Sequence, residues 1–95
     1  MVTYDKIPFD FHFGPKRYRG RIEPVSGSYL ANEIPVFWCV MMLEEGPNTQ
    51  YKYWGRLKRS RRNYFMGIEV NNKQPNSHQL RIIDKINEAT LVWFQ

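Results

Sequence analysis

The residues best suited to do chemistry in this chain are cations interleaved with aromatic rings. The stretch 46–68 holds six lysines and arginines and no acid, and tyrosine, tryptophan and phenylalanine lie between them. Cations neutralise phosphates and release counterions, and aromatic faces stack on unpaired bases. This combination is typical of a surface that binds single-stranded nucleic acid. The predicted contact residues are Lys52, Trp54, Arg56, Lys58, Arg59, Arg61 and Arg62.

Trp54 is the residue of most interest in this group. Two sets of residues alternate in this segment and predict a strand whose two faces differ: Tyr51, Tyr53, Gly55 and Leu57 in one set, and Lys52, Trp54, Arg56 and Lys58 in the other. Strict alternation places Lys52, Trp54, Arg56 and Lys58 on one face. We therefore expect an exposed tryptophan among cations, which is the geometry of a stacking platform.

A second basic group, Arg17, Arg19 and Arg21, alternates along an earlier segment and would extend the surface if that segment lies alongside. Two other interpretations stay open. Lysine and arginine stems often cover neighbouring rings on an ordinary solvated sheet surface. A net charge of +5 also suits an acidic protein partner.

Catalysis finds little support in the residue types. The histidines, His12 and His78, and the single cysteine, Cys39, lack the close spacing of a metal-ligand set. A phosphate-binding glycine loop, a zincin motif and a nucleophile elbow are not seen. Cys39 lies in the most apolar run and is expected to be a buried small hydrophobe. We predict a non-catalytic binding module without catalytic residues, metal or cofactor.

The elements that must position these residues are predicted by periodicity. Period-two alternation predicts strands over 7–13, 17–23, 51–58 and 64–70. The apolar run 34–43 predicts a strand buried on both faces, and it is too short for a membrane helix, which needs about twenty residues. Ser77 is the expected N-cap of an amphipathic helix over 78–90, where apolar residues recur every three or four positions.

These elements predict one α+β domain over 1–95. About five mostly antiparallel strands form a curved sheet or partial barrel, and one C-terminal amphipathic helix covers a face. The second face of 34–43 then needs its own cover, either by closure of the barrel or by a homodimer, which makes a protein-interaction module the alternative function.

In its order of elements the chain resembles the whirly type of single-stranded DNA-binding domain, a resemblance of architecture alone. The first residues lack the pattern of a secretory signal, so a cytoplasmic protein without membrane contact is expected.

Overall fold

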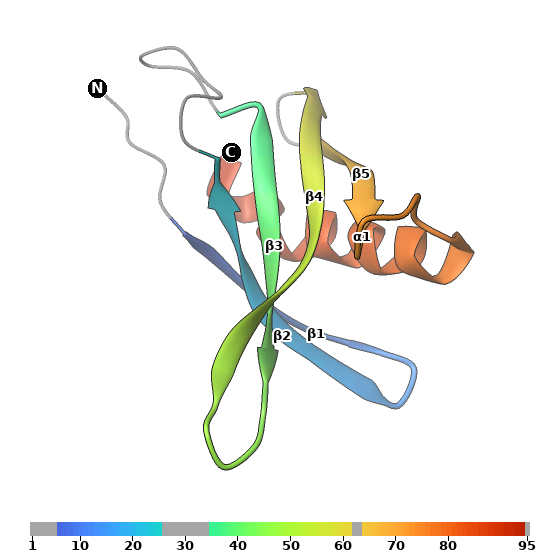
Figure 1. Cartoon of the computed structure of the whole chain (residues 1–95). Coiled ribbons are helices and arrows are strands. Elements are labelled where there is room, and N and C mark those ends of the chain that lie inside the picture. Colours follow the sequence, from blue (N-terminus) through green and yellow to red (C-terminus); the bar gives the residue numbers. More distant parts are fainter. Residues whose placement is uncertain (1–5, 26–34, 62–63, 95) are drawn as a thin grey trace.

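The fold is α+β, as predicted, with five antiparallel strands in one sheet and a single C-terminal helix (Figure 1). The structure is a computed structural model that describes residues 6–25, 35–61 and 64–94. The strands follow one another in the order β1-β2-β3-β4-β5. The elements are β1 (Ile7–Phe13), β2 (Lys16–Pro24), β3 (Phe37–Glu44), β4 (Gln50–Arg61), β5 (Tyr64–Val70), α1 (Ser77–Thr90) and a short 3-10 helix, η1 (Leu91–Phe94).

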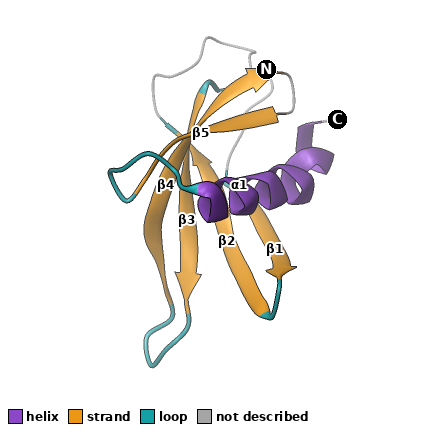
Figure 2. Ribbon diagram, turned by 90° about the vertical axis from the view of Figure 1, so that its right-hand side faces the viewer, coloured by secondary structure: helices purple, strands orange, loops and turns teal. Residues whose placement is uncertain are grey.

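The sheet curls into a half-barrel, and α1 lies inside the curl. The helix contacts both edge strands, β1 and β5, and Figure 2 shows it crossing one face of the sheet. We call this the helix-covered face and the other side of the sheet the open face. The core lies entirely between the helix and the helix-covered face. Its largest fully buried side chains include Trp38, Phe65, Ile22, Leu57 and Ile86.

Neighbouring residues of β3 show how different the two faces are. Trp38 and Val40 are fully buried, and the Trp38 indole N–H donates to the Pro35 carbonyl at 2.8 Å. Phe37 and Cys39, which point the other way, are only half-buried. The prediction that this strand is buried on both faces is therefore wrong, because the single helix covers one face alone. The predicted first residue, Ile34, lies outside the described residues.

A bulge in β4 breaks the alternation on which the face assignment depended. Val40 pairs with Gly55, but the next residue, Met41, pairs with Tyr53, which leaves Trp54 as an extra residue. A bulge reverses the parity of every position beyond it. The prediction that residues 52, 54, 56 and 58 share one face is therefore wrong.

A buried amide on the helix protects the edge of the sheet at β5. The Phe65 backbone N–H donates to Asn87 Oδ1 at 2.7 Å, and Asn87 Nδ2 donates to the Phe65 carbonyl at 2.9 Å. Asn87 Nδ2 also donates to the Ile83 carbonyl at 3.2 Å. Asn87 thus takes the place of a neighbouring strand at this residue, which prevents another chain from pairing there.

The N-cap of α1 is one residue earlier in the chain than the sequence predicted. The Gln79 N–H donates to Asn76 Oδ1 at 2.9 Å, and the Asn76 N–H donates to Gln79 Oε1 at 2.9 Å. This reciprocal pair is a capping box. The cap is therefore Asn76 rather than the predicted Ser77, which is already the first helical residue. Within the described part of the chain, none of the helices has the length and apolar character needed to span a membrane.

Candidate nucleic-acid interface

The bulge brings two tyrosines and two cations together on the open face of β4. We call this set the β4 platform; its members are Tyr51, Tyr53, Arg56 and Lys58. Their partners on β3 are, in the same order, Leu43, Met41, Cys39 and Phe37. The tyrosines are 41% and 39% exposed, so ring surface on both is available for stacking.

The other residues predicted at this site lie elsewhere. Lys52 pairs with Met42 on the helix-covered side, and its ammonium group lies 3.5 Å from Glu44. Trp54 is half-buried and packs against the hydrophobic core. The predicted exposed tryptophan is therefore replaced by Tyr51 and Tyr53.

The end of β4 contributes less than its sequence suggests. Arg59 pairs with the buried Phe65, so it belongs to the helix-covered side, where it is half-buried. Arg61 is the last residue of β4 and pairs with Tyr64. Arg62 lies outside the described residues. Of the seven residues predicted in the second basic segment, the structure brings Arg56 and Lys58 together on the open face.

The carboxylate that lies across from Arg56 in register is hydrogen-bonded to a tyrosine. Glu69 is the cross-strand neighbour of Arg56, but it accepts a hydrogen bond from the Tyr53 hydroxyl. Burial and then this hydrogen bond raise the pKa of Tyr53 to about 12, so the hydroxyl stays a donor at neutral pH. Arg56 lies over the Phe37 ring, 5.8 Å from its centroid. Neither Arg56 nor Lys58 has a carboxylate partner within the part of the chain that the structure describes.

The arginines of β2 lie on the same open face, but each one has an acid. Arg17 donates two hydrogen bonds of 2.9 and 2.6 Å to the Asp10 carboxylate, and this contact lowers the pKa of the Asp10 carboxyl. Arg19 lies 3.1 Å from a carboxylate oxygen of Glu45. The predicted extension therefore shares the face, with β3 between it and β4.

Arg21 connects this group to the β4 platform. Its Nε lies 3.5 Å from Glu23, and its guanidinium lies 3.9 Å from the centroid of the Tyr51 ring. A cation over a ring face stabilises the ring position and covers part of it. Arg21 therefore orients Tyr51 across β3 rather than adding an uncompensated charge.

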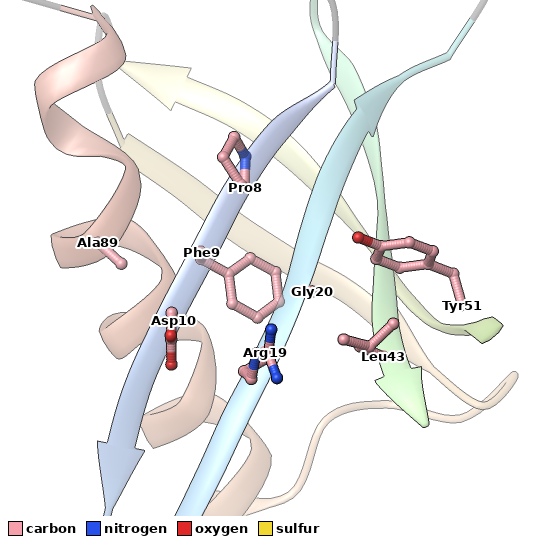
Figure 3. Close-up of a pocket in the computed structure, with 8 residues that line it drawn as sticks. All are labelled: Pro8, Phe9, Asp10, Arg19, Gly20, Leu43, Tyr51 and Ala89. Carbon is pink, nitrogen blue, oxygen red and sulfur yellow. The ribbon is translucent and has the colours of Figure 1, made fainter. Parts of the chain in front are cut away.

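A cavity of about 430 Å³ is lined by residues from β1 to β4 and by Ala89 of α1 (Figure 3). Asp10 and Arg19 line it from β1 and β2, and Leu43 and Tyr51 line it from β3 and β4. Both charged groups are already engaged, Asp10 with Arg17 and Arg19 with Glu45. The cavity therefore offers ring and aliphatic surface beside the platform rather than an acid–base pair.

The prediction that Cys39 is a buried core residue is wrong, because Cys39 lies half-buried on the open face, which the helix does not cover. Burial is the main cause that raises the pKa of its thiol, so the reactive thiolate is disfavoured. His78 packs edge-to-face on Phe13, with 5.4 Å between ring centroids. Among residues 6–25, 35–61 and 64–94, no three potential ligands gather in a way that could hold a metal ion.

Comparison of the chain with protein-family models, curated proteins and solved structures finds no match. The site is therefore interpreted from its own geometry. One sequence signal points to the tyrosines that strict alternation placed on the face opposite Arg56. Gly55 lies inside a strand, where a glycine often marks a bulge, and a bulge beside it moves Tyr51 and Tyr53 to the face of Arg56.

Proposed function

We propose that this protein is a non-catalytic module that binds single-stranded nucleic acid through the β4 platform. The observation that supports this function is the bulge at Trp54. It aligns two exposed tyrosine rings with Arg56 and Lys58, which are not ion-paired within the described residues. Rings for bases and cations for phosphates are the two components of single-strand recognition.

The spacing of the platform suits an extended strand. Successive residues on one face of a strand lie about 7 Å apart, so residues 51–58 cover about 20 Å. A nucleic-acid strand that runs along β4 meets two rings first and two cations beyond them. Bases of a duplex are already stacked on each other, so the rings favour unpaired bases.

The direct test is fluorescence anisotropy of a labelled oligothymidylate at low salt, with the matching duplex as competitor. We expect binding that the single strand displaces and the duplex displaces poorly. The charge reversals Arg56→Glu and Lys58→Glu together abolish binding. Arg81→Glu and Lys85→Glu on α1 make the same change in net charge and serve as the control. Absence of binding at low salt, or an equal loss in both pairs, contradicts the proposed function.

A protein-interaction module is the second candidate, and the open face of β3 favours it. Cys39 and Met41 are half-buried there, and the helix lies on the other side of the sheet. Burial of this strip against a second copy would form a homodimer, and the platform cations would suit an acidic protein. Sedimentation velocity distinguishes the two, since a dimer becomes a monomer on Met41→Lys, whereas a monomer at all concentrations contradicts the homodimer.

A further inference from the structure

A small pocket lies where β4 bulges, on the side of the strand away from Arg56 and Lys58. Its volume is about 180 Å³, and its lining residues are Met42, Glu44, Lys52, Tyr53, Trp54 and Asn71. We propose that this pocket receives one unpaired base of the bound strand. Because the ligand is the same strand, the inference rests on the function proposed above.

The pocket is held open by a tight turn packed on the bulge. The Asn71 N–H donates to the carbonyl of Trp54 at 3.1 Å. Asn71 and Asn72 have left-handed φ values of 51° and 67°, and Val70 and Lys73 exchange backbone hydrogen bonds of 2.8 and 3.1 Å around them. Two consecutive left-handed residues are the signature of a type I′ hairpin turn. One wall of the pocket is thus fixed before any ligand binds.

The lining suits a flat ring with polar edges. Trp54 supplies an aromatic surface, and the Asn71 side chain has an amide that both donates and accepts hydrogen bonds. Lys52 supplies a cation at the rim, where Glu44 lies 3.5 Å away. The volume is below the roughly 300 Å³ at which pockets for larger ligands begin, so it suits one ring system rather than a whole nucleotide.

A strand on the β4 platform has a short route into this pocket. β5 pairs with β4 only from Gly55 to Arg61, so on that side no described strand pairs with residues 50–54. Tyr53 belongs to the platform and also lines the pocket. A backbone that follows Tyr51 and Tyr53 therefore passes around this edge, and the next base enters beside Trp54.

Tryptophan fluorescence tests the pocket separately from overall binding. In a Trp93→Phe background the emitters are Trp54 and the fully buried Trp38. We expect oligothymidylate to quench the emission in step with its binding by anisotropy, and a fully abasic strand of equal length to bind without quenching. Saturating anisotropy without quenching overturns the base pocket and leaves the proposed function intact. Absence of any anisotropy change contradicts the proposed function, and the pocket with it.

A matched pair of variants in the turn tests the role of the amide. Asn71→Gly tolerates the left-handed backbone and removes the side chain from the pocket, whereas Asn72→Gly makes the same change outside the pocket lining. We expect Asn71→Gly to lower affinity for oligothymidylate about two- to tenfold, which is the range for one hydrogen bond, and to leave affinity for the abasic strand unchanged. Asn72→Gly changes neither affinity. Equal effects of the two substitutions, or no effect of Asn71→Gly on oligothymidylate affinity, overturn the pocket.

Discussion

Two basic strands of the same sheet, β2 and β4, differ in how much of their positive charge can act on a ligand. Arg17, Arg19 and Arg21 of β2 each lie within 3.5 Å of a carboxylate oxygen. Arg56 and Lys58 of β4 have no such partner within the described residues, and Tyr53 occupies Glu69, the acid nearest in register. A phosphate gains less from a cation that must first leave an acid. The number of arginines in a strand is therefore a poor measure of its affinity for nucleic acid.

The largest effect on single-strand affinity is expected from removing the tyrosine rings of the β4 platform. Tyr51→Ala and Tyr53→Ala are each expected to weaken single-strand binding by about 1–3 kcal/mol, because each removes one stacking face. Tyr51→Phe keeps the ring and serves as the control, with binding close to wild type. Anisotropy titrations measure the affinities, and urea unfolding checks that each variant is fully folded under the conditions of the titration. Full affinity in both alanine variants would place the bound strand elsewhere.

The second prediction concerns the acids that pair with the arginines of β2. Asp10→Asn together with Glu45→Gln leaves Arg17 and Arg19 without their carboxylates. We expect tighter binding and a plot of log K against log salt that steepens by about 1.4, at about 0.7 for each cation gained on a single strand. An unchanged slope would mean that β2 lies outside the path of the strand, whatever its charge state.

The third prediction tests how Tyr53 keeps Arg56 unpaired. Tyr53→Phe retains the ring but releases Glu69, which can then pair with its cross-strand neighbour Arg56. The salt slope should become shallower by about 0.7, which corresponds to the loss of one cation. Adding Glu69→Gln should restore the slope. If Tyr53→Phe alone leaves the slope intact, Tyr53 acts through its ring only.

The smallest effect concerns pH. Because Arg17 lowers the pKa of Asp10 below its ordinary value of 3.8, the pair contributes stability above that value and loses it as pH falls through the lowered pKa. The stability difference between wild type and Asp10→Asn should therefore be constant at neutral pH and disappear in acid. Unfolding by urea across pH measures it. A difference that grows as pH falls would contradict the assigned pair.

The strands and the helix of this fold can be predicted from the sequence, because burial of one face makes apolar residues recur with the period of the element. Five alternating or apolar runs and one helical run correspond to the observed strands and helix. Register is harder, because a bulge inserts one residue without changing composition. Trp54 looks like any other alternating position. Gly55 beside it is a weak signal for a bulge, but the fold is needed to show that Met41 skips Trp54 to pair with Tyr53.

Two further features depend on contacts between distant segments. Asn87 has the residue type of an exposed helix position, yet it is buried because it satisfies the backbone of Phe65 across 22 positions in the chain. Whether an arginine is ion-paired likewise depends on acids that folding brings near it, as Glu45 is brought near Arg19. The positions of the basic segments are therefore predictable from the sequence, whereas the absence of a carboxylate partner at a particular cation is not.

The comparison of β2 with β4 is tested most directly by the salt slope of single-strand binding in two double variants. Arg56→Gln with Lys58→Gln and Arg17→Gln with Arg19→Gln each remove two positive charges from the open face. The first pair should make the slope shallower by about 1.4, and the second should change it much less. Equal changes in the two pairs, or a larger change for the β2 pair, would contradict the β4 platform as the binding surface.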